Sequence, residues 1–569
     1  MHTSDLQVVY TNPAKCRDCY RCVRVCPVNA IKMIDAQASV IAERCIACGL
    51  CVNECPQDAK QYKRDLEEVV KLLKSDSNVA ISIAPSFVTI FEEWQIKRLP
   101  SALRKIGFSH ISETAIGAYH SALRTAEHIN DNPEKSHICS ACPVVVNYIE
   151  KYSPESIPNI SPVLSPMISH ARIIKSKCGP ETKVVFVGPC IAKKQEASRN
   201  ELKSYVSAVL TFEELFELLE TNNIDLSAFE ESDFDDIPAG DSQLFPLEGG
   251  LLKTANIEFG LADTDSLAIS GSNDIMDAIN CLKSSDKAVV IEPLWCKNGC
   301  INGPSIPKQD NNFIKRRKVL DYAHNSKKPD LPEELIKTST FFKNKNPDKN
   351  ENFSDEQILD IYSKTGKSLK ENQLNCGACG YDNCRENAIA VLEGIAESEM
   401  CIPFMRRTAE QKSNTIIKRA PNGIVVLDDK LRIVSLNPAF MEMFSCTDKI
   451  IGKPISYLID QDPFEQLIAN PDQPIKKVIR YNSYNLICNQ IHYSIPDENQ
   501  YVGVFVDITN LQQNQTKLTN LKTETVIQAQ ELMEHQIEMA QQMAKFLGEN
   551  TAKGETLMRN LIKVIDDNK

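Results

Sequence analysis

The sequence predicts a multidomain protein of mixed α/β and α+β architecture, and three observations lead to this fold class. At 569 residues the chain is too long for one domain, and a prior of about 150 residues per domain suggests roughly four. Two copies of one cysteine spacing lie within residues 1–62. From residue 79 onward, short β-rich runs alternate with helical segments, which is typical of a parallel sheet flanked by helices.

Composition and charge argue against several classes of partner. The net charge of -12 argues against non-specific binding to nucleic acid or to an acidic membrane surface. No apolar stretch approaches the roughly 18 residues of a membrane span, and the N-terminus lacks both the apolar core of a signal peptide and a twin-arginine pair. We therefore expect a cytoplasmic protein, in whose reducing environment dense cysteines indicate metal binding rather than disulfides.

The first element, residues 1–62, is built around two cysteine runs with the spacing Cys-x2-Cys-x2-Cys-x3-Cys-Pro. In this pattern three cysteines of each run bind one 4Fe-4S cluster, and the fourth binds the other cluster. The predicted ligands are Cys16, Cys19, Cys22 and Cys55 for one cluster, and Cys45, Cys48, Cys51 and Cys26 for the second. Zinc, the alternative, would use two separated Cys-x2-Cys pairs per site. The segment therefore predicts a ferredoxin-like, two-cluster domain that carries electrons.

The second element, residues 78–345, is a predicted α/β domain that follows a connecting helix at Asp65–Lys74. Its buried strands are expected at 79–86, 184–189 and 288–293. Cysteines follow the second and third strands directly, and ligands gather at the carboxyl ends of parallel strands. Four cysteines of this domain are the complement for one further 4Fe-4S cluster: Cys142, Cys190, Cys296 and Cys300.

The contexts of these cysteines resemble the FeFe-hydrogenase family over about residues 1–304. Its three signatures correspond in order to Cys142-Pro143, Pro189-Cys190-x2-Lys193-x2-Glu196 and Cys296-x3-Cys300-x2-Gly303. The resemblance implies an H-cluster, which is a 4Fe-4S cubane joined to a two-iron subsite with carbonyl and cyanide ligands. It implies that Cys142, Cys190 and Cys296 bind the cubane, that Cys300 bridges it to the subsite, and that Lys193 hydrogen-bonds a cyanide. Gly249 and Gly250 also match a family segment, as cofactor-binding residues.

The same resemblance implies H2 as substrate, Cys300 and Lys193 as catalytic residues, a ferredoxin or other redox partner, and hydrogenase maturation proteins. Two departures from the family pattern point to low turnover. Active members carry a proton-relaying cysteine where this chain has Ala141, and a methionine where it has Leu294. His120 and Ser140 are the alternative proton carriers nearby.

A small cysteine-containing module is expected at residues 353–410, after a surface extension and linker at about 304–352. Its cysteines follow the spacing Cys376-x2-Cys379-x4-Cys384-x16-Cys401. We interpret this as one further 4Fe-4S site, with zinc as the alternative. The module resembles a small cluster-binding domain of anaerobic redox proteins.

Residues 414–511 resemble a PAS domain, with strands at 422–429 and 501–509 and a helix around Pro438–Phe444. PAS domains sense or relay signals and often dimerise, so we expect a homodimer. The ligand of this domain is unknown. His492 is the only histidine in it, and a lone histidine is more often a structural residue than a haem ligand. Residues 512–569, with apolar residues at helical spacing, predict a C-terminal helix or coiled coil for signalling or effector docking.

This domain order resembles the PAS-containing sensory FeFe-hydrogenases. The leading hypothesis is a protein that binds or slowly turns over H2 and relays a redox signal through the PAS domain to a phosphatase or kinase. One alternative is an ordinary ferredoxin-linked hydrogenase, which exchanges electrons between H2 and ferredoxin. Another is a non-enzymatic 4Fe-4S redox switch that lacks the two-iron subsite.

Overall fold

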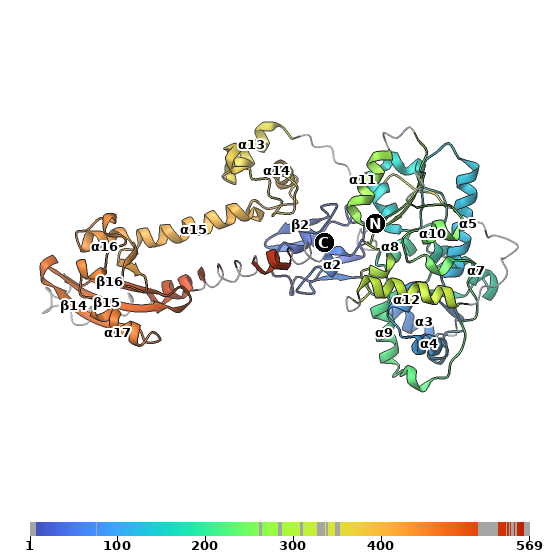
Figure 1. Ribbon diagram of the computed structural model, residues 1–569, viewed down its shortest axis with the longest axis horizontal. Helices are drawn as coiled ribbons and strands as arrows, with labels where there is room; N and C mark the ends of the chain where they lie inside the picture. Colours follow the sequence, from blue (N-terminus) through green and yellow to red (C-terminus); the bar gives the residue numbers. More distant parts are fainter. Residues whose placement is uncertain are drawn as a thin grey trace. The chain divides into compact units, whose positions relative to one another are not determined.

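The computed structural model falls into two compact units, Met1–Ile402 and Pro403–Lys569, which we describe separately (Figure 1). The residues that the structure describes are 7–75, 77–260, 265–282, 287–307, 311–326, 336, 339–346, 353–509, 533–541, 543–544, 547, 551, 555–560 and 562. Among the described helices, none is both long and apolar enough to cross a bilayer.

The N-terminal segment of the first unit folds as an internal repeat of two half-domains. Strand β1 (Val9–Thr11) pairs antiparallel with β4 (Lys60–Tyr62), and β2 (Ile31–Ile34) pairs antiparallel with β3 (Gln37–Val40). Two short helices, α1 (Arg21–Arg24) and α2 (Leu50–Asn53), contain the third cysteine of each run.

Left-handed backbone occurs at matching places in the two runs. Asp18 and Ala47 have φ values of 51° and 59°, and Tyr20 and Gly49 have φ values of 55° and 79°. These residues turn the chain tightly around each group of thiols before the short helix begins. The predicted connecting helix follows as α3 (Leu66–Lys74).

The α/β domain contains two parallel sheets, where the sequence predicted one. The first has the order β6-β5-β8-β9, from strands β5 (Val79–Ile83), β6 (His110–Glu113), β8 (Lys183–Gly188) and β9 (Ala208–Thr211). The second has the order β10-β11-β7, from strands β7 (His137–Ile138), β10 (Ser266–Ser270) and β11 (Val290–Leu294). Strand β11 pairs with β10 and β7, both outside the predicted strands, and this separates it from β8.

Helices cover both sheets. Strand β5 is buried throughout and β8 over all but its first residue, as expected for parallel strands covered on both faces. The helices of this domain are α4 (Glu93–Ile106), α5 (Ala115–Asp131), α6 (Pro143–Tyr152), α7 (Pro166–Cys178), α8 (Ala192–Ala197), α9 (Phe212–Thr221), α10 (Gly250–Thr254) and α11 (Ser272–Leu282).

Part of the predicted linker at 304–352 is instead an ordered helix, α12 (Asn312–Asn325). Its Val319 belongs to the main hydrophobic core. Lys315 in this helix is 4% exposed and donates a hydrogen bond to the Pro307 carbonyl at 2.9 Å. The high content of Pro, Lys, Asn and Asp across the whole segment favoured a linker, although six of the 14 residues of the helix are apolar.

The small module packs against the N-terminal domain within the first unit. It contains α13 (Asp355–Lys364) and α14 (Cys384–Leu392). The Met33 amide donates to the Ile395 carbonyl at 3.3 Å, and Arg44 pairs with Glu393 at 2.9 Å. A Cβ added at Gly380 would lie only 3.2 Å from the Arg24 backbone, so this glycine permits the close approach.

The second unit has the PAS fold expected from the sequence. Its five-stranded antiparallel sheet has the order β13-β12-β16-β15-β14. The elements are α15 (Ile402–Arg419), β12 (Gly423–Leu427), β13 (Ile433–Leu436), α16 (Pro438–Met443), α17 (Asp462–Ala469), β14 (Ile475–Tyr481), β15 (Leu486–Ile495) and β16 (Gln500–Asp507). Of the predicted C-terminal helix, residues 533–541 are helical, and residues 510–532 lie outside the described residues.

Candidate functional site

The four cysteines of the α/β domain line one cavity of about 110 Å³. Cys142 immediately precedes α6, Cys190 lies between β8 and α8, and Cys296 and Cys300 follow β11. The carboxyl ends of strands from both sheets therefore meet at this cavity, as the strand-end positions of the cysteines predicted. Lys193, from the first turn of α8, lines the same cavity.

Two glycines hold the loop that carries Cys296 and Cys300 against its neighbours. Gly299 has a φ of 90°, and a Cβ there would lie 2.3 Å from the Pro246 carbonyl oxygen. At Gly303 a Cβ would lie 2.6 Å from the Pro189 carbonyl oxygen. The Cys300 amide donates to the Pro246 carbonyl at 2.8 Å, so the second pair of thiols is fixed by backbone contacts.

The predicted cofactor-binding glycines, Gly249 and Gly250, lie in the turn next to the cavity wall. Among the described residues that line it, Phe245 and Pro246 are present, whereas Gly249 and Gly250 are not. A Cβ at Gly250 would lie 2.1 Å from the Leu244 carbonyl oxygen, and Gly249 has a φ of 80°. Both glycines thus allow the tight turn that holds Phe245 and Pro246 in the wall.

The chemistry of the four thiols fits a multiply charged iron–sulfur group. Burial raises the pKa of Cys190 to about 12 and raises the pKa of Cys296 and Cys300 further, and nearby thiols add to each shift. Four thiolates in one apolar cavity require a cationic centre to hold them together. A 4Fe-4S cubane, with its four thiolate ligands, matches this donor set.

Lys193 places a buried positive charge at the wall of the cavity. It is 8% exposed, and its Nζ lies 2.7 Å from Glu196 Oε2. The same nitrogen lies 3.4 Å from the carbonyl oxygen of Ala141. The lysine therefore stands directly beside the position that lacks the cysteine, and it can interact with anionic ligands in the cavity.

Four polar residues that sequence reasoning did not select also line the cavity: Ser86, Thr114, Cys139 and Glu292. Burial raises the pKa of Glu292 to about 7, and its carboxylate accepts hydrogen bonds from the Leu251 and Leu252 amides, both at 3.1 Å. The hydroxyl of Ser86 is buried without a hydrogen-bond partner among the described residues. The sequence did offer a signal for Glu292 and Ser86. Glu292 is a charged residue inside the otherwise apolar strand β11, and Ser86 lies just beyond the end of β5.

The structure also brings together the predicted ligands of the N-terminal domain. One small hollow is lined by Cys16, Cys19, Cys22 and Cys55, so the fourth thiol comes from the other run. The buried thiols Cys26, Cys45, Cys48 and Cys51 act on one another electrostatically. Cys48 also lines the α/β cavity, which places the second group directly beside it.

In the small module the four cysteines differ in exposure. Cys376 is exposed, Cys384 and Cys401 are buried, and Cys379 is intermediate. Cys379 and Cys401 act on one another electrostatically, and Cys384 begins α14. Throughout the part of the chain that the structure describes, no three His, Cys, Asp or Glu side chains are arranged to hold a single metal ion.

Family models match all of these regions. The model of the iron-only hydrogenase large subunit, C-terminal domain, matches residues 77–304, which include the described residues that line the cavity apart from Cys48. The chain carries an iron-only hydrogenase domain. A 4Fe-4S dicluster model matches residues 8–56, an Fe-S cluster model matches 372–403, and a PAS model matches 411–477.

The curated relatives of this chain include hydrogenases and iron–sulfur cluster assembly factors. The NADP-reducing hydrogenase subunit HndD of Solidesulfovibrio fructosivorans is 26% identical, over 50% of this chain and 60% of its own length. Iron hydrogenase 1 of Clostridium pasteurianum is 26% identical, over 54% of this chain and 66% of its own length. The cytosolic Fe-S cluster assembly factor NAR1 of Kluyveromyces lactis is 27% identical, over 34% of this chain and 44% of its own length. The chain thus spans less than two thirds of each of these relatives.

Proposed function

We propose that this hydrogenase-like iron–sulfur protein binds H2, or turns it over slowly, at an H-cluster and passes the redox signal to its PAS domain. One observation carries the proposal. Four thiols and Lys193 line a single apolar cavity, while Ala141 stands where active relatives have the relaying cysteine. The cavity thus has donors for the cluster and lacks the usual proton donor.

In this proposal the residues of the chain hold, orient and insulate the group. Cys142, Cys190, Cys296 and Cys300 supply the thiolates, and Lys193 supplies a cation for anionic ligands. When bound, the two-iron subsite would supply an iron with an open position for H2. The apolar wall, which includes Phe186, keeps water away from that position.

Slow turnover follows from the chemistry of Ala141, because a methyl group carries no proton. Loss of a positioned acid or base typically lowers a rate by about 10²–10⁴-fold. Electrons have a direct route through the two predicted clusters of the N-terminal domain. Cys48, a predicted ligand of one cluster, lines the cavity, and Cys19, a predicted ligand of the other cluster, is exposed to solvent. A ferredoxin or a similar carrier is therefore the redox partner we propose.

The signalling step is supported by the connection between the module and the PAS domain. Cys401 immediately precedes α15, and the Asn437 amide donates to the Ile417 carbonyl near the end of that helix at 3.1 Å. A change at the module's cluster can thus reach the PAS domain through one helix. A phosphatase or kinase that binds the PAS domain or the C-terminal helix is the proposed receiver, and a homodimer is the proposed assembly.

The relationship to NAR1 favours a second candidate, an iron–sulfur protein without H2 chemistry. NAR1 is described as a cytosolic Fe-S cluster assembly factor, and it is 27% identical over 208 residues. Lys193 argues for the first proposal, because a site that holds only a cubane has no need of a buried cation beside Ala141.

Infrared spectroscopy distinguishes the two candidates. The full chain is produced anaerobically with the hydrogenase maturation proteins and measured with and without H2. Carbonyl and cyanide bands that shift under H2 support the first proposal, and their absence from competently matured protein overturns it. The Cys300→Ser variant is the matched control: it should lose these bands while the clusters of the N-terminal domain remain.

A further inference from the structure

A chain of hydrogen-bonded side chains leads from the cavity wall into the protein interior. Thr114 lines the cavity, and its hydroxyl lies 2.7 Å from the hydroxyl of Ser82 on β5. Ser82 Oγ lies 2.7 Å from His170 Nδ1, and His170 Nε2 lies 3.2 Å from Ser112 Oγ on β6. Each of these four residues is at most 3% exposed.

Every member of this chain can both donate and accept a hydrogen bond. A hydroxyl has one proton and two lone pairs, and a neutral imidazole donates from one nitrogen and accepts at the other. Burial lowers the pKa of His170 to about 3, so its ring is neutral at physiological pH. The ring can therefore accept a proton at one nitrogen and release another from the opposite nitrogen.

Polar side chains at these positions need an explanation. Strand β5 reads VAISI and is buried along its whole length, so Ser82 is a hydroxyl inside an otherwise apolar strand. An apolar residue there would avoid the cost of burying a polar group. The hydroxyl of Ser82 instead contacts both Thr114 and His170, each at 2.7 Å.

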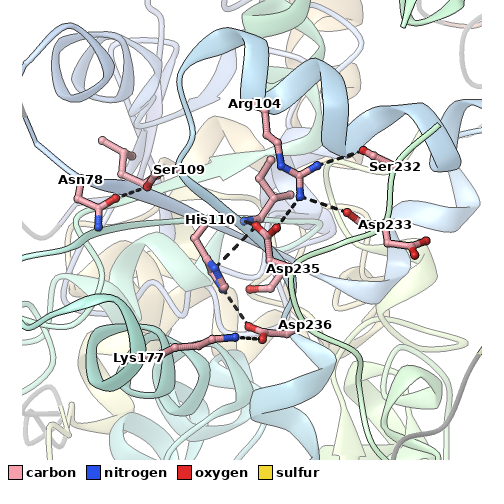
Figure 2. A network of polar contacts seen from close by, with 12 residues as sticks. Asn78, Arg104, Ser109, His110, Lys177, Ser232, Asp233, Asp235 and Asp236 are labelled. Carbon is pink, nitrogen blue, oxygen red and sulfur yellow. Dashed lines mark hydrogen bonds and ion pairs between the residues drawn. The ribbon is translucent and has the colours of Figure 1, made fainter. Parts of the chain in front are cut away.

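A charged cluster that contains His110, Asp236 and Lys177 lies at the start of β6 (Figure 2). His110 and Ser112 are two residues apart on β6, so their side chains lie on the same face of the sheet. His110 Nε2 lies 2.9 Å from Asp236 Oδ2, and Lys177 of α7 pairs with the same carboxylate. The side chain of Asp236 is 20% exposed and that of Lys177 is 52% exposed, so solvent reaches this cluster.

A gap of one hydrogen-bonding group separates the buried chain that ends at Ser112 from the surface cluster of His110 and Asp236. Asp236 and His110 both act electrostatically on His170, which places them near it. Among these described residues, no direct hydrogen bond joins Ser112 or His170 to His110. A single bridging water would complete the connection, with the hydroxyl of Ser112 and the ring of His110 as its partners.

We propose that Thr114, Ser82, His170 and Ser112 form a proton path between the cavity and the His110–Asp236 pair. It takes the place of the cysteine that is missing at Ala141. For each proton that the His110–Asp236 pair takes from solvent, His110 gives one to the bridging water and the water gives one to Ser112. Ser112 gives one to His170 Nε2, and His170 releases one from Nδ1 to Ser82. Ser82 gives one to Thr114, and Thr114 releases one into the cavity. H2 oxidation runs the same transfers in reverse. This inference rests on the proposed function, because it supposes that H2 reacts in the cavity.

The test compares His170→Gln and Ser82→Ala with Ser121→Ala in the matured full chain. Glutamine keeps hydrogen bonding but cannot exchange protons between two nitrogens. Ser121 is the matched control, since its buried hydroxyl oxygen lies 2.9 Å from both Ser169 Oγ and the Leu164 carbonyl oxygen, outside the path. The readouts are HD formation from D2 in H2O and the infrared bands. A third readout is solvent exchange of the His170 ring proton by ¹⁵N NMR, which does not depend on turnover.

The path predicts that both variants form HD at least tenfold more slowly than the wild type, while Ser121→Ala stays within twofold. Their infrared bands should be unchanged, and Ser82→Ala should slow exchange of the ring proton. Wild-type rates in Ser82→Ala, with intact bands, would overturn the path even if His170→Gln does not fold. If the wild type shows no H2-responsive bands, the proposed function fails and the path fails with it.

Discussion

At the scale of single residues, Ala141 is the position on which the rate of the proposed H2 turnover depends. Its carbonyl lies 3.4 Å from Lys193 Nζ, so the side chain stands at the cavity wall. We expect Ala141→Cys to raise H2 production at least tenfold, because it restores a proton donor at this position. The measurement is H2 evolution with a reduced viologen. Ala118→Cys adds a thiol elsewhere in the same cavity and should not raise the rate. An unchanged rate in matured Ala141→Cys would contradict the relay argument.

A second prediction concerns the pH dependence of stability. Burial raises the pKa of Glu113 from 4.5 to about 7, while its carboxylate accepts hydrogen bonds from Gln243 and from Tyr322 at 2.8 Å. A raised pKa in the folded state contributes stability at low pH that is lost as pH rises through 7. We expect Glu113→Gln to gain about 2 kcal/mol in unfolding free energy relative to wild type between pH 5 and pH 8.

Urea unfolding at the two pH values tests the Glu113 prediction. The exposed Glu220 provides the control, since Glu220→Gln should leave the difference between the two pH values unchanged. A Glu113→Gln curve that moves with pH as the wild type does would show that this carboxyl ionises freely in the folded protein.

At the scale of structural elements, the loop between β11 and Cys300 depends on Gly299. Its φ of 90° and the distance of 2.3 Å from an added Cβ to the Pro246 carbonyl oxygen leave no room for a side chain. We expect Gly299→Ala to displace Cys296 and Cys300 and to lower the iron content of the chain by about the four irons of one cubane. Gly452→Ala is the control, because Gly452 of the PAS domain has a φ of 83° and no described atom lies within 4 Å of a Cβ there. Equal iron content in both variants would contradict the predicted ligand role of this loop.

Local sequence patterns predicted the elements that position the cysteines, because Cys190 follows β8 and Cys296 follows β11 closely in the chain. The helix α12 was missed, since its core contact through Val319 is tertiary and the composition of the whole segment around it favoured a linker. The network around His170 was also beyond sequence reasoning. Ser82 and His170 are 88 residues apart, and only the packing of α7 on β5 brings them together. Networks of this kind depend on the fold and leave no spacing in the sequence.

At the scale of the whole molecule, each unit has its own hydrophobic core. The clusters around β5 and β8 contain residues of the first unit, whereas Phe440, Phe464 and Phe505 lie in a cluster built within the second. The PAS unit should therefore unfold separately, as a transition that does not depend on H2 or on the maturation proteins. In this respect the chain consists of a unit with the hydrogenase-like domain and a separate unit with the PAS domain.

Asn437 provides a specific test of this separation. Its side chain accepts hydrogen bonds from the Ile424 amide at 2.7 Å and the Phe440 amide at 3.0 Å, and it donates to the Asn422 carbonyl at 2.8 Å. Because these buried backbone groups would lose their partner, we expect Asn437→Ala to cost about 2 kcal/mol or more.

The loss should lower the midpoint of the PAS transition by roughly 5 °C or more, measured by differential scanning calorimetry. The transition of the first unit should not move, because Asn437 belongs to the second unit alone. Asn482→Ala, at a site in the β14–β15 turn of the same unit, should leave both transitions in place. A shift of both transitions in Asn437→Ala would show instead that the two units unfold together. In that case the PAS domain would be coupled to the first unit by more than the helix that joins them.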